Sequence, residues 1–520
     1  MLLGTLRVAA TPGIRRSAIV VLLSVWIVLP VLFGYTGRTE QDETVYFEPV
    51  VEWFESGAPG NAYVTGLQEG VARVSLLQPP GWTYFLAPFY ALFGFSYLTV
   101  RIAFAVQVLV LGLLRTGWSR STNTSLVATA SVFALAVTTP ALLAEPGRMD
   151  LLAGLFLAAA FRMLSRQAPA GNARDVGIGM LLGLSGLVHA IPGVTGAVGV
   201  AVALGLKRSD LRRLPRVYAA AAATVALLWL PLLWGHWDMF GDQFVAHGQR
   251  HLALFGGVGK IFKLHRGVPI VVFPLAAALA RLALARDRLG LLRTPEYRFV
   301  AGPLAVMTAV VLCSTVTWYY YLDYLIPLAA WLLILQLSAA TRWLDARATG
   351  RGRSVGARAV AAAMVLAVLL LGRGRVLYDQ FLVPLNGRAS PEAIYSEVVR
   401  SSVQPGSFVV ADPVVYYSAR PLAGAIRELE TFGLREGPSG YERVDYLVLL
   451  ERRGELLYRI RNAAAREYIE RHFVPVADRR VSVRSLSPGG ALRGRLTVRT
   501  PVGRLVVLRN RHAAPTAGGA

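Results

Sequence analysis

Residues 17–46 read SAIVVLLSVWIVLPVLFGY followed by TGRTEQDETVY, a stretch in which Asp42 and Glu43 stand side by side. The apolar part is long enough to cross a bilayer as one helix, which takes about 20 residues. No small-residue cleavage site follows it, so we expect it to remain as a spanning helix. Paired carboxylates at the end of a membrane helix are costly unless they have a use. These two acids are therefore the first candidates for chemistry, at the outer edge of a membrane.

The composition places the chain among membrane proteins. Of its 520 residues, 54% are hydrophobic and only 16% are charged, whereas soluble domains carry roughly 25% charged residues. The net charge is +23, but the basic residues fall in short clusters between apolar segments, so we expect no nucleic-acid partner. The single cysteine, Cys313, excludes an intramolecular disulfide and a cysteine-rich metal site.

Apolar segments recur through residues 1–373, and we predict a mainly α-helical, polytopic membrane protein of about 11 transmembrane helices. The predicted spans are residues 17–35, 100–114, 124–143, 150–165, 176–190, 192–206, 216–235, 267–285, 299–316, 323–340 and 358–373. With the N-terminus in the cytoplasm, basic loops alternate with acidic ones along the chain, as the positive-inside rule requires. The segment 81–95 is short and aromatic, so we expect it to lie as a helix on the outer face without crossing.

Two outer loops are long, residues 36–99 and residues 236–266. The second is basic, against the positive-inside rule, and its notable side chains are His247, Arg250, Lys260 and Lys263. These cations either bind an anionic ligand or reflect the scatter of basic residues in a +23 chain, and both interpretations stay open. The spacing of His247 and His251 is more typical of an ordinary helix face than of a zinc site.

Beyond residue 373 the pattern changes, because no apolar run there is long enough to span a membrane. We predict helices at 391–402 and 455–471, and strands at 407–412, 445–450, 481–486 and 495–508. Residues 374–510 are thus expected to form a small extracytoplasmic α/β domain, and residues 511–520 a disordered tail. Asp412 closes the first strand; strand-end acids can line sites in α/β sheets, although a simple turn is more common.

Three further clusters are candidates for binding a substrate at the outer edge. Gln78-Pro79-Pro80 form a rigid entry into an aromatic helix. Arg101 stands at the mouth of a helix, where it either snorkels to the interface or pairs with an acid or a phosphate. Arg148 and Asp150 stand two residues apart, and they either bind a headgroup or form a salt-bridged loop.

In this order, the motifs resemble those of the GT-C membrane glycosyltransferases related to protein O-mannosyltransferases and the lipid A aminoarabinose transferase. That family shows Asp-Glu in the first outer loop, Lys-Pro-Pro before an aromatic helix, and Arg-Pro-Asp at the start of a later span. Here Gln78 stands in place of the lysine and Met149 in place of the proline. Residues 318–327, with Tyr320 and Tyr321, are similar to the family's His-Tyr-x-Leu-Pro segment. The resemblance covers about residues 40–340.

The resemblance implies transfer of one sugar from a polyprenyl-phosphate donor to a glycan, lipid or protein acceptor outside the cytoplasm. Asp42 is our first candidate for the general base on the acceptor hydroxyl, and Glu43 is the second. The expected substrate-binding residues are Tyr46, Gln78, Arg101, Arg148, Asp150, His247, Arg250, Lys260, Lys263, Tyr320 and Tyr321. Phosphate is a good leaving group, so no cofactor is obligatory, and a divalent metal beside the phosphate stays open.

Two other classes of protein are weighed against this one. A transporter or flippase for a lipid-linked anionic substrate requires broken helices and charges in mid-bilayer. The one clear break predicted is Ile191-Pro192-Gly193, next to His189, while the charges gather at the outer edge. A non-catalytic membrane scaffold has no need for ordered acid and arginine motifs, so it ranks last.

Overall fold

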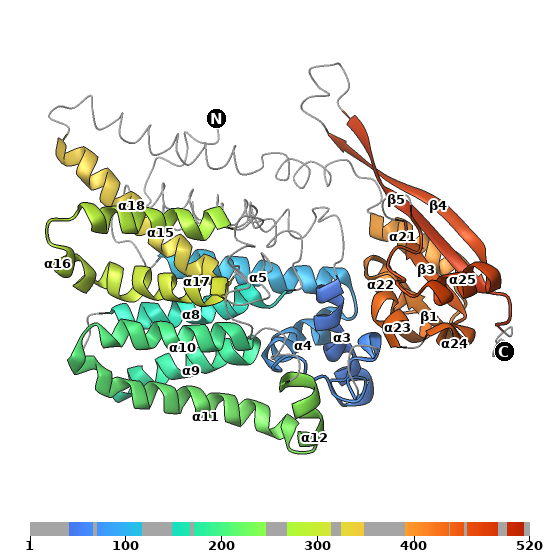
Figure 1. Cartoon of the computed structure of the whole chain (residues 1–520), viewed down its shortest axis with the longest axis horizontal. Coiled ribbons are helices and arrows are strands. Elements are labelled where there is room, and N and C mark those ends of the chain that lie inside the picture. Colours follow the sequence, from blue (N-terminus) through green and yellow to red (C-terminus); the bar gives the residue numbers. More distant parts are fainter. Residues whose placement is uncertain are drawn as a thin grey trace, which may run out of the picture.

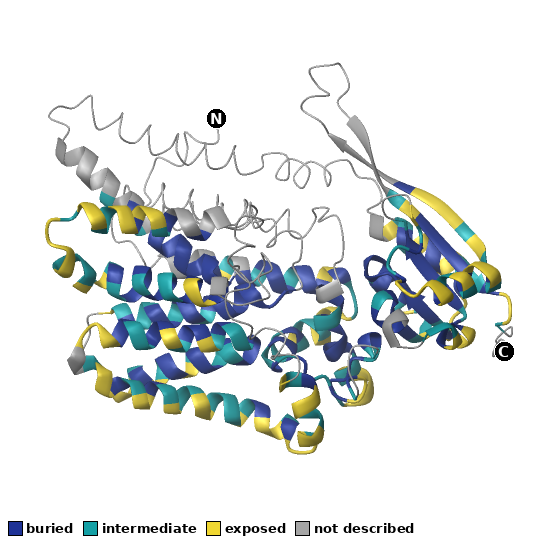
Figure 2. Cartoon of the chain, in the orientation of Figure 1, coloured by how far each residue is buried: buried dark blue, intermediate teal, exposed yellow. Residues whose placement is uncertain are grey.

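The computed structural model describes residues 41–65, 70–116, 148–166, 171–245, 268–313, 324–347, 391–435, 437–451, 455–486 and 497–513. Within these residues the chain forms a bundle of long helices and, beyond one end of it, a smaller unit built on a single sheet (Figure 1). The prediction of a mainly helical fold with a small sheet is confirmed. The hydrophobic core runs from the outer helices into the sheet, as the buried residues in Figure 2 show.

The bundle and the helices at its outer end account for most of the described chain. Their bounds are α3 Gln41–Ser56, α4 Gly81–Phe93, α5 Tyr97–Thr116, α8 Asp150–Ser165, α9 Asn172–Val188, α10 Ala190–Gly205, α11 Leu214–Leu233, α12 Trp237–Phe240, α15 Val268–Leu284, α16 Arg288–Arg293, α17 Gly302–Cys313 and α18 Ile326–Arg347. Short 3-10 or π turns are η1 Ala62–Val64, η2 Arg208–Arg213, η3 Gly241–Val245 and η4 Tyr297–Ala301. Each predicted span inside the described part corresponds to a helix, and α4 stands where the outer-face helix was expected.

The number of membrane crossings stays a prediction. By length and composition, one helix of the described part, Asp210–Leu233, is long and apolar enough to cross a membrane. Four shorter apolar helices accompany it, at Tyr97–Leu111, Ala190–Gly205, Pro274–Leu284 and Tyr297–Val311. The predicted spans 17–35, 124–143 and 358–373 lie outside the described residues.

Small residues bring the bundle helices together. A Cβ on Gly179 of α9 would stand 2.2 Å from the carbonyl oxygen of Val217 in α11, and one on Gly183 would stand 2.6 Å from that of Ala221. Glycines four residues apart on one helix face let two backbones approach closely, which is a common way for helices to pack in membranes. The close contact of α9 and α11 therefore depends on the absence of side chains at these two positions.

The break between the fifth and sixth predicted spans lies earlier than expected. Helix α9 ends at Val188 and α10 begins at Ala190, so the break is at His189, whose backbone is extended, and not at residues 191–193. Pro192 falls in the first turn of α10. A proline is tolerated there because the first N–H groups of a helix have no intrahelical partner.

The sheet of the smaller unit has the strand order β2-β1-β3-β5-β4. Its strands are β1 Ser407–Ala411, β2 Ala423–Glu428, β3 Tyr446–Leu450, β4 Phe473–Leu486 and β5 Thr497–Asn510, and its helices and turns are α21 Pro391–Ser402, η7 Pro413–Val415, α22 Tyr416–Ala419, α23 Leu429–Arg435, α24 Gly437–Gly440, η8 Tyr441–Arg443 and α25 Ala463–His472. The first three strands are parallel, and β5 joins the sheet antiparallel to β3 and β4. Strand β2 was not predicted, because Ala-Gly-Ala-Ile-Arg-Glu lacks the apolar alternation of a strand.

Helix α25 differs from the prediction in its first residue. We expected a helix over 455–471, but α25 begins only at Ala463. Asn462 caps it, because its side chain accepts a hydrogen bond from the backbone N–H of Ala465. Asp412 is also not an exposed turn residue. It is fully buried, and its carboxylate accepts from the N–H of Val414 at the start of η7.

We expect Gly154→Ala to destabilise the bundle. A Cβ at Gly154 of α8 would stand 2.3 Å from the carbonyl oxygen of Tyr324, at the entry to α18. Because the obstacle is backbone, the helices must shift, at a cost of about 1–3 kcal/mol. Thermal unfolding in detergent measures the loss as a lower midpoint. Gly205→Ala, whose new Cβ would make only ordinary contact with Leu211 at 3.8 Å, is the matched control; equal midpoints for the two variants would contradict the expectation.

Candidate active site

The acidic stretch of the first outer loop belongs to helix α3. Asp42 and Glu43 are the second and third described residues of this helix, Gln41–Ser56. Glu43 has no solvent-exposed surface. The side chain of Asp42 lies outside the described residues. One turn further along the helix, Tyr46 faces a small cavity.

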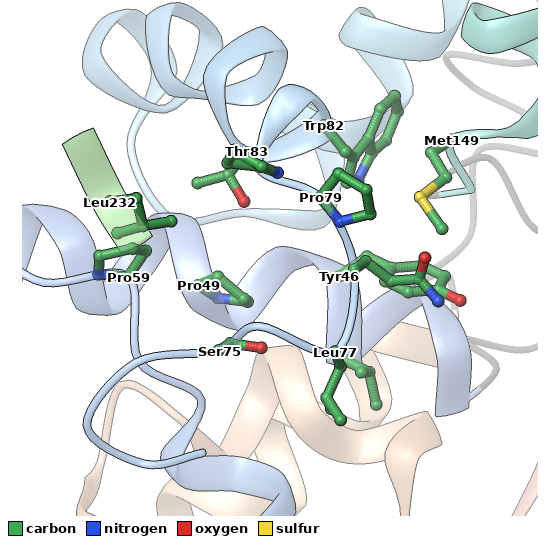
Figure 3. Close-up of a pocket in the computed structure, with 13 residues that line it drawn as sticks. Tyr46, Pro49, Pro59, Ser75, Leu77, Pro79, Trp82, Thr83, Met149 and Leu232 are labelled. Carbon is green, nitrogen blue, oxygen red and sulfur yellow. The ribbon is translucent and has the colours of Figure 1, made fainter. Parts of the chain in front are cut away.

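This cavity lies where three of the sequence motifs meet (Figure 3). It has about 440 Å³ of empty space, part of it open to solvent, and its lining includes Tyr46, the Gln78-Pro79-Pro80 turn and Met149. Gly81 allows the residue after the turn to pack closely against α9, because a Cβ there would stand 2.6 Å from the backbone of Leu187 at the end of that helix. Motifs about 30 and 70 residues apart in the sequence therefore share one wall.

Arg148 and Asp150 form a buried ion pair next to this cavity. The Nε of Arg148 donates to Oδ2 of Asp150 over 2.8 Å, and both side chains are almost fully buried. The guanidinium of Arg148 lies over the ring of Tyr46, with 5.8 Å to the ring centroid. His189, at the break between α9 and α10, brings Nδ1 to 3.6 Å from the other oxygen of Asp150. The two residues thus form a buried ion pair on either side of the lining residue Met149, where the sequence left open a headgroup site or a salt-bridged loop.

Arg101 does not snorkel to the interface. It is 8% exposed, and its guanidinium lies 4.1 Å from the centroid of the Tyr97 ring, a cation–π contact. The Tyr97 ring in turn contacts that of Tyr417, which comes from the sheet unit, at 5.2 Å. Burial raises the pKa of the Tyr417 hydroxyl, and the nearby Glu43 carboxylate raises it further. The sheet unit therefore reaches the acidic start of α3.

One arginine of the sheet unit forms ion pairs with three glutamates of α3. Arg420, directly after α22, lies 3.0 Å from Glu48, 3.6 Å from Glu52 and 2.6 Å from Glu55. These glutamates are spaced along one face of α3. The Tyr416 hydroxyl also donates to Glu48, which is fully buried. We call these five residues the α3 clamp. No local pattern in the sequence marks it.

A second contact docks the first outer loop on the sheet. The hydroxyl of Tyr63, from η1, donates to the carbonyl oxygen of Ala411 over 3.4 Å, at the carboxyl end of β1. Beside it, Arg459 lies 3.5 Å from Asp412 and 3.4 Å from Glu428, the acids that end β1 and β2. Ligands of α/β sheets usually bind at this edge. Here the chain's own side chains occupy it.

Six predicted substrate-binding residues lie outside the described part of the chain: His247, Arg250, Lys260, Lys263, Tyr320 and Tyr321. Of the predicted residues, Tyr46 and Gln78 line the cavity. The Arg148–Asp150 pair flanks the lining residue Met149, with Arg148 over the Tyr46 ring, and Arg101 contacts Tyr97. Glu43 is buried on the same helix as Tyr46 but is not a lining residue. Among the described residues, no group of three or more histidine, cysteine or acidic side chains is placed to hold a metal ion.

The fold of this chain is similar to that of ArnT, of which two solved structures superimpose on it. ArnT from Cupriavidus metallidurans in the apo state superimposes with a TM-score of 0.56 at 14% identity, over 96% of this chain and 99% of that one. ArnT bound to undecaprenyl phosphate gives 0.55 at 16% identity, over the same 96% and 99%. No protein-family model and no curated protein matches the sequence. The resemblance is confirmed for the fold, and at this identity the likeness establishes the fold alone.

We expect Arg420→Gln to loosen the sheet unit from α3. Removing the cation leaves the buried Glu48 without its counter-charge, at a cost of about 3 kcal/mol. A lower thermal unfolding midpoint measures this loss. Arg461→Gln is the control, because Arg461 pairs with Glu430 while 74% exposed, and exposed pairs contribute little. A similar midpoint in both variants would show that the clamp does not hold the two parts together.

Glu48 is expected to make this stability depend on pH. Burial raises the pKa of Glu48 to about 7, although the Arg420 charge and the Tyr416 hydroxyl act in the opposite direction. Its folded pKa lies above the unfolded value of 4.5, so its contribution is complete below that value and is lost as the pH rises through 7. Between about pH 5 and pH 8, the free energy of unfolding of wild type should fall relative to that of Glu48→Gln, by at most about 3 kcal/mol. A thermal midpoint that falls with pH in wild type alone measures this loss. Parallel pH curves for both proteins would contradict the raised pKa.

Proposed function

We propose that this chain is an integral membrane glycosyltransferase that moves a sugar from a polyprenyl-phosphate donor to an acceptor on the extracytoplasmic side. The observation that carries the proposal is that residues of three motifs line one cavity: Tyr46 of the acidic segment, the Gln78-Pro79-Pro80 turn, and Met149 between the paired Arg148 and Asp150. The ArnT structure with bound undecaprenyl phosphate supports this class of donor.

The residues divide the chemistry between them. A carboxylate at the start of α3, Asp42 first and Glu43 second, takes the proton of the acceptor hydroxyl as it attacks the anomeric carbon. Arg148 and Arg101 stabilise the donor phosphate as it leaves, because guanidinium groups match phosphate oxygens. Asp150 orients Arg148, because its carboxylate accepts a hydrogen bond from Nε of the arginine guanidinium.

The proposed placement follows the charge pattern of the loops. The N-terminus lies in the cytoplasm, and both the cavity and the sheet unit lie outside the plasma membrane, where a lipid-linked donor and its acceptor meet. The basic loop 236–266, with His247, Arg250, Lys260 and Lys263, and the Tyr320–Tyr321 segment are proposed as further donor contacts. A divalent metal at the phosphate stays a prediction. Adding a chelator to the transfer assay tests it.

We expect Asp42→Asn to abolish sugar transfer while the protein still folds. The test offers purified full-length chain a panel of radiolabelled polyprenyl-phosphate sugars and measures release of polyprenyl phosphate. Loss of a general base lowers the rate by about 100-fold or more. Asp478→Asn, which changes a 43% exposed carboxylate in β4 of the sheet unit, should retain full activity. Equal turnover by Asp42→Asn and wild type would move the base to Glu43, which Glu43→Gln then tests.

One observation favours a second function, a transporter or flippase for a lipid-linked anionic substrate. Buried His189 sits at a helix break beside the buried Asp150, and broken helices with buried ionisable groups are typical of transport proteins. In the same assay, intact donor binding with no turnover of any donor by wild type would favour transport over transfer.

A further inference from the structure

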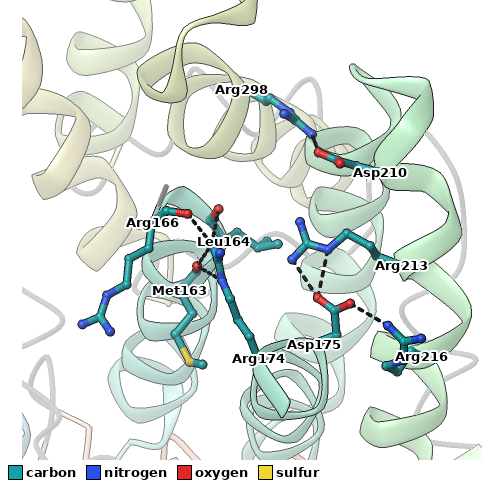
Figure 4. Close-up of polar contacts among 9 residues, drawn as sticks. All are labelled: Met163, Leu164, Arg166, Arg174, Asp175, Asp210, Arg213, Arg216 and Arg298. Carbon is teal, nitrogen blue, oxygen red and sulfur yellow. Dashed lines mark hydrogen bonds and ion pairs between the residues drawn. The ribbon is translucent and has the colours of Figure 1, made fainter. Parts of the chain in front are cut away.

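The end of the bundle opposite the cavity is crowded with arginines. Helix α8 has 16 residues, so its C-terminal end lies about 24 Å from the Arg148–Asp150 pair. Arg166, Arg174, Arg213, Arg216 and Arg298 lie around that end, together with the carboxylates of Asp175 and Asp210 (Figure 4). Positive charge is therefore in clear excess here.

The contacts in this cluster fix where its arginines point. Buried Asp175 accepts from Nε of Arg213 at 2.9 Å and from the terminal nitrogens of Arg213 and Arg216 at 2.7 and 3.1 Å. Arg298 pairs with Asp210. Arg174 is used within the fold, because it donates to the carbonyl oxygens of Leu164 and Arg166, at 2.9 and 2.6 Å, and so caps the end of α8.

Arg216 is more exposed than the other two arginines that pair with these carboxylates, Arg213 and Arg298. Its side chain is 44% exposed while Asp175 holds one of its terminal nitrogens. A guanidinium has five N–H donors in a planar fork, so a second anion can be bound on the exposed side. Arg212, one turn earlier, is exposed as well. Two exposed arginines, Arg212 in η2 and Arg216 in α11, therefore lie at the N-terminal end of α11.

The rest of α11 presents an apolar stripe in line with these arginines. Exposed positions of α11 follow helical spacing along one face, namely Arg216, Ala219, Ala223, Leu227 and Leu230, and the exposed Arg212 of η2 precedes them. Leu227 is 75% exposed, and only 17% of the apolar window of Asp210–Leu233 is buried. From Arg216 to Leu227 the helix rises about 16 Å. The face thus carries cations at one end and a hydrocarbon surface along the bilayer depth.

We propose that this face of α11 binds an anionic phospholipid, with Arg212 and Arg216 on its phosphate and the acyl chains along Leu227 and Leu230. The charge pattern complements such a lipid, and basic clusters at the ends of membrane helices attract anionic headgroups. Asp175 positions Arg216 before the lipid arrives, which reduces the entropy lost on binding. The proposal rests on the membrane placement of α11 and not on the reaction.

The test measures binding of phosphatidylglycerol and phosphatidylcholine to the full-length chain in detergent. Wild type should prefer phosphatidylglycerol, and the double variant Arg212→Gln/Arg216→Gln should bind it about 25-fold more weakly, from about 5-fold for each arginine. Phosphatidylcholine binding should not change. The matched control is Arg461→Gln/Arg471→Gln, which removes two exposed arginines from the sheet unit and should leave both affinities unchanged.

Several outcomes would overturn the proposal. They are equal binding of the two lipids by wild type, an unchanged phosphatidylglycerol affinity in the double variant, and an equal loss in the control. Inorganic phosphate that competes as well as the lipid would show an ion site with no role for the acyl chains. If the glutamine variant does not fold, Arg212→Lys/Arg216→Lys keeps the charge but not the planar fork, and a weaker, salt-sensitive preference for phosphatidylglycerol is expected.

Discussion

The contact between Arg420 and the glutamates of α3 is the constraint on which the proposed active site depends. Glu48, Glu52 and Glu55 follow Asp42 and Glu43 on the same helix, so the position of the acidic turn is fixed by a cation from the sheet unit. A buried carboxylate cannot leave its counter-charge without a large loss of free energy. The α3 clamp therefore fixes α3 against the sheet unit.

The sheet unit uses its ligand-binding edge for docking. Parallel strands β1 and β2 end in Asp412 and Glu428, and Arg459 neutralises both while Tyr63 of the outer loop contacts the backbone beside them. Acids at this edge in other α/β sheets often hold a ligand. In this chain the same geometry holds the protein to itself, and the cavity proposed for the substrate lies instead beside α3, the Gln78-Pro79-Pro80 turn and α4.

Long apolar segments made the helices predictable, and short or polar elements were missed. Helix α8 has the predicted bounds because Asp150 begins an apolar run that ends in polar residues. The break at His189 was placed two residues too late, since proline was taken as the breaking residue although a first helical turn accepts it. Of the candidate site, the motif residues Tyr46, Gln78, Arg148 and Asp150 were found from sequence, and the clamp residues were not.

The sequence by itself determined the helical bundle and identified the motif residues, because apolar length and residue pattern are local properties of the chain. The membrane placement and its orientation stay predictions from the same pattern. Only the tertiary structure decided that Tyr416, Tyr417 and Arg420 meet α3. Tyr416 and Glu48 are 368 positions apart, and each alone is an ordinary polar residue in its segment. Their pairing becomes favourable only when folding removes both from water and brings them into contact.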